Sequence, residues 1–142
     1  MKKVNKIDDV ANELIKGKIL YRYINESTYN FDKLKSQGII DASPTQFPGY
    51  ATLENIDDAV KAKSVLQLPK EPTWVVEFNA NQILNDVKFP TGKFNNTNYK
   101  EVLTRSFPEW GKGGGSQFIT NSMIKVKLIR NLKTGEVMKF NP

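Results

Sequence analysis

Short β patterns recur along this chain, and each is separated from the next by a short helical pattern or by a turn rich in Pro and Gly. The segments with branched, aromatic or alternating residues, typical of strands, are 18–24, 50–53, 73–78, 116–120, 123–129 and 137–140. Short strands interrupted by short helices predict an α+β fold. We expect the 142 residues to form one domain, with an N-terminal helix within 1–17 and an α+β core over 18–142.

The ends of the helices between these strands are predicted from capping residues. One helix is expected to begin after Ser27 or Thr28 and to end at Gly38, because hydroxyl residues cap N-termini and Gly favours left-handed C-termini. The next helix is expected to be capped by Asn55. The polar stretch 79–115 has weak periodicity and is long for a loop, which favours a binding or lid element.

Cysteine and histidine are both absent. Their absence excludes disulfides, thiol nucleophiles, Ser-His-Asp triads, zinc fingers and histidine general bases. Any chemistry must therefore use carboxylates, amides, hydroxyls, Lys, Arg or a bound cofactor. No Asp-x-Asp-x-Asp loop or other metal-ligand spacing occurs, so we expect no metal site.

The net charge of +6 is concentrated in the second half of the chain. Residues 1–71 carry 11 basic and 10 acidic groups, whereas residues 72–142 carry 10 basic and 5 acidic groups. Such a field favours an anionic partner, such as RNA, a nucleotide or an acidic protein, although a solvated basic surface gives the same pattern.

No apolar run approaches the ~18 residues of a membrane helix, so no membrane span is expected. Acidic residues interrupt the N-terminal segment before any apolar core, so we expect no signal peptide.

Polar side chains on two of the predicted strands are candidates for ligand contacts. Arg22 lies between Tyr21 and Tyr23 in a strand, where a planar guanidinium suits a diphosphate or a ribose better than Lys does. A salt-bridged or edge-exposed arginine is the structural alternative. Tyr50 and Thr52 lie at the end of a strand, where the hydroxyl of Thr52 contacts a ligand or caps the following helix.

A third candidate segment is the run of three glycines at 113–115, followed by Ser116 and Gln117. Glycine permits close approach of the backbone to a ligand, or a mobile loop. The run lacks the spacing of a phosphate-binding P-loop. Together with Trp110 before it and Gln117 after it, it indicates a shaped loop beside a site.

The order of these segments resembles that of ADP-ribosyltransferases of the diphtheria and cholera toxin type. That family carries an Arg or His on a first strand, a Ser/Thr- or Tyr-bearing second strand, and a Glu at the start of a later strand. Residues 20–22, 50–52 and 113–119 look like these segments. The resemblance covers about residues 18–130 and is nearest to C-terminal domains of bacterial polymorphic toxins. It implies a split β-sandwich of two small sheets that cradles NAD.

The resemblance also implies roles for individual residues. Arg22 would bind the phosphates or ribose of NAD, Thr52 would order the site, and Gln117 would hold the position of the family's glutamate. The remaining pocket residues would be Tyr21, Tyr50, Trp110 and Ser116. The implied reaction breaks the glycosidic bond of NAD, transfers ADP-ribose to a macromolecular target, protein or RNA, and releases nicotinamide.

Gln117 departs from the family pattern, because an amide keeps the hydrogen bond of a carboxylate but loses its charge. Three explanations are open: Glu109 or Glu77 serves instead, a subgroup uses Gln by another mechanism, or this form is inactive. If Gln117 does hold the glutamate's position, replacing it by Glu is expected to raise turnover.

A histidine-free ribonuclease toxin that cleaves tRNA or rRNA is the alternative enzyme. The residues that would surround its phosphate are Arg105, Lys112, Gln117, Thr120, Lys125 and Lys127. The basic second half favours this interpretation, whereas the lack of histidine weakens it. A third interpretation is a non-enzymatic binding module that uses Trp74, Trp110 and the basic strands.

Either toxin interpretation implies a cellular context. The domain would be secreted or delivered as part of a larger toxin and would act in the cytoplasm of a competitor or host cell. A cognate immunity protein is an implied partner, and it is expected to be acidic so that it complements the basic face.

Overall fold

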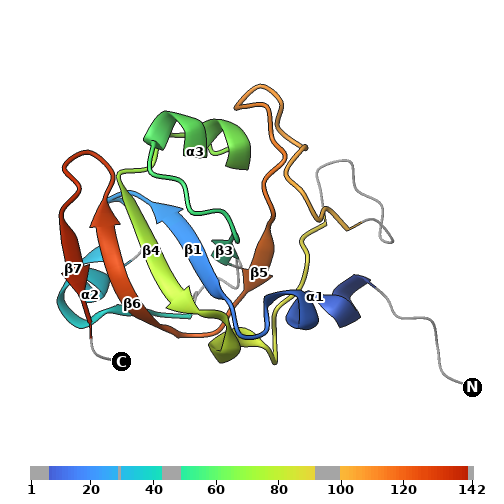
Figure 1. Ribbon diagram of the computed structural model, residues 1–142, viewed down its shortest axis with the longest axis horizontal. Coiled ribbons are helices and arrows are strands. Elements are labelled where there is room, and N and C mark those ends of the chain that lie inside the picture. Colours follow the sequence, from blue (N-terminus) through green and yellow to red (C-terminus); the bar gives the residue numbers. More distant parts are fainter. Residues whose placement is uncertain (1–6, 29, 43–48, 92–99, 141–142) are drawn as a thin grey trace, which may run out of the picture.

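The computed structural model describes residues 7–28, 30–42, 49–91 and 100–140. They form an α+β domain with two antiparallel sheets and a few short helices, as Figure 1 shows. The predicted α+β class is therefore confirmed. Part of the expected N-terminal segment, residues 1–6, and part of the polar stretch, residues 92–99, lie outside the described residues.

The larger sheet has the strand order β1-β4-β6-β2, and β7 pairs with β6. Its strands are β1 (Ile19–Ile24), β2 (Ile39–Ile40), β4 (Trp74–Asn79), β6 (Ile124–Asn131) and β7 (Val137–Lys139). The central strand β4 buries Trp74, Val76 and Phe78 as the alternation predicts, but Val75 on its other face is also fully buried. At these positions β4 is therefore buried on both faces.

The smaller sheet consists of β3 (Gly49–Ala51) and β5 (Phe118–Thr120). It is joined to the larger sheet where Tyr21 of β1 and Thr52 exchange two backbone hydrogen bonds of 2.9 Å. This contact places the end of β3 and the start of β5 beside β1 (Figure 1).

The helices are short: α1 (Ile7–Ile15), α2 (Phe31–Gln37), α3 (Ala59–Leu66) and a 3-10 turn η1 (Ala80–Ile83). Gly38 ends α2 with a left-handed φ of 68°, as predicted, but its N-cap is Asn30 and not Ser27 or Thr28. Asp58 caps α3, because its side chain accepts a hydrogen bond from the Val60 amide. The expected cap Asn55 instead accepts a hydrogen bond of 3.0 Å from Arg130.

One apolar core lies between the larger sheet, α1 and α2. Its fully buried members come from every part of the chain and include Ala11, Ile15, Leu20, Val76, Phe78, Ile124 and Ile129. Phe118 of β5 and Phe89 extend the core under the smaller sheet, with ring centroids 5.4 Å apart. The smaller sheet is thus anchored to the same core that supports β1.

The described part of the long polar stretch is tied to β5. Lys88 and Ile119 exchange backbone hydrogen bonds of 3.0 and 2.8 Å, and Leu103 forms a bridge with Ser116. The segments before and after residues 92–99 therefore lie against β5 and against Ser116, which flank Gln117 on either side. No helix within the described residues is long and apolar enough to cross a membrane.

Candidate functional site

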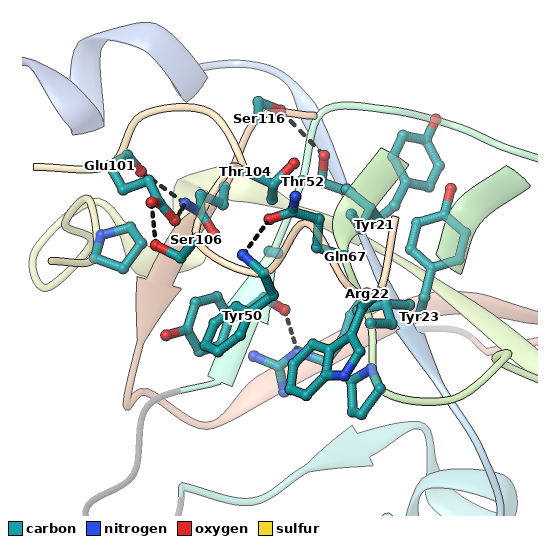
Figure 2. A pocket seen from close by; sticks show the side chains of 18 of the residues that line it. Tyr21, Arg22, Tyr23, Tyr50, Thr52, Gln67, Glu101, Thr104, Ser106 and Ser116 are labelled. Atoms are coloured by element: carbon teal, nitrogen blue, oxygen red, sulfur yellow. Dashed lines mark hydrogen bonds between the residues drawn. The ribbon is translucent and has the colours of Figure 1, made fainter. Parts of the chain in front are cut away.

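A cleft of about 430 Å³ opens where β1, the end of β3, the end of α3 and the segment 101–117 meet (Figure 2). This volume lies within the range of small-molecule sites, roughly 300–1,000 Å³. Every residue that the transferase resemblance assigns to the NAD site lines it: Tyr21, Arg22, Tyr50, Thr52, Trp110, Ser116 and Gln117. The structure therefore brings together three segments that are far apart in the sequence.

Arg22 projects from β1 into this cleft without a carboxylate partner among the described residues. Its Nε donates a hydrogen bond of 2.9 Å to the main-chain oxygen of Tyr50. Burial lowers the pKa of Arg22 to about 10, because the charged form loses part of its hydration. A half-buried guanidinium whose partner among the described residues is a carbonyl, and not a carboxylate, is suited to an anionic ligand.

Gly49 leaves room for the Arg22 guanidinium. A Cβ placed on Gly49 would lie 2.6 Å from Cζ of Arg22, far closer than atoms of this kind approach. The absence of a side chain at the start of β3 therefore sets where the guanidinium lies.

Aromatic rings form much of the cleft wall. Tyr21 and Tyr23 extend from β1 on one side of the cleft, opposite Glu101 (Figure 2). Trp110 stacks on Phe107 with ring centroids 4.4 Å apart and planes 12° apart. Burial, and then the nearby charge of Glu101, raises the pKa of the Tyr50 phenol. Flat rings of this kind suit a planar heterocycle.

Gln67 holds the stacked aromatic pair against the end of α3. It is the left-handed C-cap of α3, at φ 52°, and is buried. Its Nε2 donates to the Gly111 carbonyl at 3.0 Å, and its Oε1 accepts from the Phe107 amide at 3.0 Å. One side-chain amide thus orients the segment that carries Trp110.

The hydroxyls of Thr52 and Ser116 are both engaged with Glu54. Each donates a hydrogen bond of 2.8 Å to Oε1 of Glu54, and Ser116 Oγ accepts from the Leu53 amide at 2.9 Å. The Ser116 amide also donates to the same carboxylate oxygen. Glu54 therefore joins the end of β3 to the segment entering β5, and Thr52 and Ser116 shape the cleft through it.

Gln117 is bound to a second buried carboxylate, that of Glu101. Its Nε2 donates to Oε1 of Glu101 at 2.8 Å and to the Glu101 carbonyl at 2.9 Å. Ser106 Oγ donates to the other oxygen of the same carboxylate. Glu101 and Gln117 are only 5% and 8% exposed, yet both line the cleft.

The other glutamates considered from the sequence do not line the cleft. Glu77 lies on β4 and pairs with Arg130, with 3.6 Å between Nη1 and Oε2. Glu109 is exposed and lies outside the cleft. The carboxylate that reaches the cleft beside Gln117 is that of Glu101.

The residues of the ribonuclease alternative are not gathered at this cleft. Gln117 is the one member that lines it, whereas Arg105, Lys112, Lys125 and Lys127 are exposed elsewhere. Thr120 is buried and donates a hydrogen bond to Asp86.

The binding-module interpretation relies on Trp74, which is 3% exposed. Its Nε1 donates to Glu26 at 2.9 Å. Trp74 therefore belongs to the core and offers little surface to a partner.

The glycine run forms an ordered contact with α3. The Gly113 amide donates to the Ser64 carbonyl at 2.9 Å, and the Gly115 amide donates to the Val65 carbonyl at 3.2 Å. A Cβ on Gly111 would lie 2.7 Å from the Ser64 carbonyl carbon, so glycine is needed for this close approach. The run therefore docks the loop on α3.

A second hollow of about 310 Å³ adjoins the cleft and shares Tyr23, Leu68 and Pro69 with it. The space available to an elongated ligand therefore continues beyond Tyr23. Among the residues that the structure describes, no group of three or more acidic side chains is placed to hold a metal ion.

Sequence patterns did not indicate Glu101, Gln67 or Glu54. Glu101 lies in the stretch of weak periodicity, and Gln67 follows a helix whose end is marked more strongly by Pro69. Glu54 lies between the strand predicted at 50–53 and the predicted helix cap Asn55. Only their partners, which are 16 to 62 residues away, distinguish them from surface residues.

Comparison of the chain with protein-family models, curated proteins and solved structures finds no match. The family resemblance therefore remains a prediction.

Proposed function

We propose that this cleft binds NAD and cleaves the bond between nicotinamide and ribose, so that ADP-ribose is transferred to a macromolecular acceptor. The observation that carries the proposal is the convergence of Arg22, from β1, and Gln117, which directly precedes β5, on one cleft with aromatic walls. A guanidinium without a carboxylate partner in the described residues, an oriented amide and flat rings match the diphosphate, the ribose and the nicotinamide.

Each part of NAD has a complementary group. The Arg22 guanidinium would take the diphosphate, since its planar fork donates two hydrogen bonds to phosphate oxygens. The rings of Tyr50 and Trp110 would flank the nicotinamide. Oε1 of Gln117 would accept a hydrogen bond from a hydroxyl of the nicotinamide ribose, because both amide hydrogens are already donated to Glu101.

The reaction needs no metal or redox partner. The bond between C1′ and the pyridinium nitrogen breaks, and its electron pair leaves with the nitrogen, which neutralises the positive charge of the ring. The oxocarbenium-like ribose is then captured by an oxygen or nitrogen of the acceptor, whose proton passes to solvent. Positive charge develops on the ribose in the transition state, and hydrogen bonds to the ribose hydroxyl strengthen as it does. These bonds therefore lower the activation barrier.

The two sheets that meet at β1 support a split β-sandwich of the ADP-ribosyltransferase type as part of this proposal. The proposal includes a cellular role: the chain would be a toxin domain, delivered within a larger protein to the cytoplasm of a target cell. An acidic immunity protein would be its natural inhibitor, given the net charge of +6.

Nicotinamide release and ligand-induced thermal stabilisation, measured on purified protein with NAD, test the proposal. We expect a rise in Tm that grows with NAD concentration, and release of nicotinamide above a protein-free control. Parallel incubation with total tRNA and rRNA provides the comparison. RNA cleavage without NAD binding would refute the transferase and support the ribonuclease.

A further inference from the structure

We infer that Glu101 is a positioning residue for the proposed reaction. It holds the Gln117 amide so that the amide oxygen is available to the ribose, and it supplies the negative charge that the amide lacks. The inference rests on the proposed function. It explains how a glutamine serves where a glutamate is expected.

The hydrogen bonds around Glu101 fit an ionised carboxylate. Oε1 accepts from Nε2 of Gln117 at 2.8 Å, and the second oxygen accepts from Ser106 Oγ. Both partners donate, and an ionised carboxylate is an acceptor only. Glu101 is 5% exposed, so these donors replace the water that it has lost.

The same bonds determine which way the Gln117 amide points. Nε2 faces two acceptors, the carboxylate and the main-chain oxygen of Glu101, at 2.8 and 2.9 Å. Turning the amide over would set its oxygen against both of these oxygens. Oε1 is thus the atom of Gln117 left for a ligand, and none of the described groups donates to it.

The charge of Glu101 also reaches the ligand through this amide. A carboxylate that accepts from an amide N–H draws positive charge toward it and increases the negative charge on the amide oxygen. The effect is strong in a buried site, where solvent screens little. A carboxylate at position 117 itself would face Glu101 across one hydrogen-bond distance, and two like charges there would repel.

The substitution Glu101→Gln tests the role of the charge, because it keeps the size and hydrogen-bonding shape of the side chain. We expect kcat for nicotinamide release to fall roughly 10- to 100-fold, as it does when residues that orient metal ligands are replaced. We expect KM for NAD to stay within about 3-fold, because the interaction strengthens mainly in the transition state. Glu109→Gln, which removes the same charge from an exposed residue outside the cleft, is the matched control.

Exchanging the carboxylate and the amide between positions 101 and 117 distinguishes an effect on catalysis from an effect on folding. The sequence alone predicts that Gln117→Glu raises turnover, but beside Glu101 this substitution places two buried carboxylates side by side, so we expect it to lower both Tm and turnover. In the double variant Glu101→Gln/Gln117→Glu, an amide at position 101 donates to a carboxylate at position 117. We therefore expect the wild-type Tm and a kcat at least as high as that of the wild type.

The outcomes distinguish the inference from the function on which it rests. If the wild type releases nicotinamide and Glu101→Gln retains its kcat, Glu101 is only structural and the inference fails while the function stands. A rise in turnover from Gln117→Glu alone would also overturn it. If the wild type neither binds nor cleaves NAD, the proposed function fails and the inference fails with it.

Discussion

The charged side chain of Arg22 reduces the stability of the folded protein. It is half-buried, it meets no carboxylate in the described part of the chain, and burial lowers its pKa to about 10. The protonated form is therefore less favourable in the folded protein than in the unfolded chain. Functional sites often carry groups that reduce stability in this way, since the ligand compensates for them.

Replacing Arg22 by Ala should abolish NAD binding while leaving the fold intact. Charged hydrogen bonds contribute about 1.5–3 kcal/mol each, so loss of two to the diphosphate weakens binding by at least about 100-fold. We expect the free energy of unfolding to stay the same or to rise by roughly 0.5–2 kcal/mol. Calorimetric titration with NAD and urea unfolding measure the two effects.

Arg105→Ala is the control, because it removes the same charge from an exposed position outside the cleft. It should leave the NAD affinity unchanged. Arg22→Lys should bind almost as weakly as Arg22→Ala, since Lys lacks the planar fork. Wild-type affinity in Arg22→Ala would show that another group holds the ligand.

Gly49→Ala should displace the Arg22 guanidinium without removing it. The new Cβ would meet Cζ of Arg22 at 2.6 Å, and the flexible arginine gives way more easily than the backbone of β3. We expect NAD affinity to fall by about 10-fold or more with little change in Tm. Calorimetric titration measures the loss.

A double-mutant cycle shows whether the effect passes through Arg22. In the Arg22→Ala background, Gly49→Ala should add little further loss, because the two changes act on one contact. Additive losses would mean that Gly49 affects the cleft by another route.

At the scale of elements, α3 and the glycine-rich loop act as one unit. The loop donates main-chain hydrogen bonds to carbonyls at the end of α3, and Gln67 ties residues 107 and 111 to the same helix end. The position of the Trp110 ring in the cleft therefore depends on the docking of the loop.

Gly111→Ala should disturb this docking. A Cβ 2.7 Å from the Ser64 carbonyl carbon forces two main chains apart, at a cost of about 1–3 kcal/mol in the free energy of unfolding. We also expect weaker NAD binding, because the stack of Phe107 and Trp110 moves. Urea unfolding measures the change in stability, and the fluorescence of the protein with added NAD measures the change in binding.

Gly114→Ala is the control, because we expect it to lower the free energy of unfolding by about as much as Gly111→Ala does. Gly114 has φ 97° and open space around its Cβ position, so alanine adds backbone strain of roughly 1–2 kcal/mol without a collision. It should leave NAD affinity intact. Equal loss of affinity in both variants would indicate that the loop acts through its flexibility and not through its contact with α3.

At the scale of the whole molecule, the basic surface and the cleft are separate features. The exposed lysines of β6 and β7, at positions 125, 127 and 139, do not line the cleft. The net charge of +6 therefore bears on partners that approach the surface, whereas in the proposed function Arg22 would hold the ligand of the cleft.

Salt should separate the two kinds of binding. Raising NaCl from about 50 to 200 mM should weaken NAD binding by less than about 5-fold, because few charges are involved. An RNA held by 6–10 phosphate contacts would lose about 10³–10⁵ in affinity over that range. Titrations with NAD and with tRNA at both concentrations make the comparison, and a steep fall for NAD would contradict a site built on one guanidinium.

The sequence by itself determined the local features of this protein. Alternating and branched residues specified the strands, Gly38 specified the end of α2, and the lack of His and Cys limited the available chemistry. It also singled out Arg22, Thr52 and Gln117, because an arginine flanked by aromatics, a hydroxyl at a strand end and an amide after a glycine run are visible in short segments. These features depend on neighbours a few residues away.

Only the tertiary structure decided how these segments act together. It placed Glu101, and not Glu77 or Glu109, beside Gln117. It made Asp58 the cap of α3, whereas Asn55 bonds to Arg130. It also made the glycine run a docking surface for α3. Such contacts join residues far apart in the chain, so their partners are determined by packing of the two sheets and not by any local pattern.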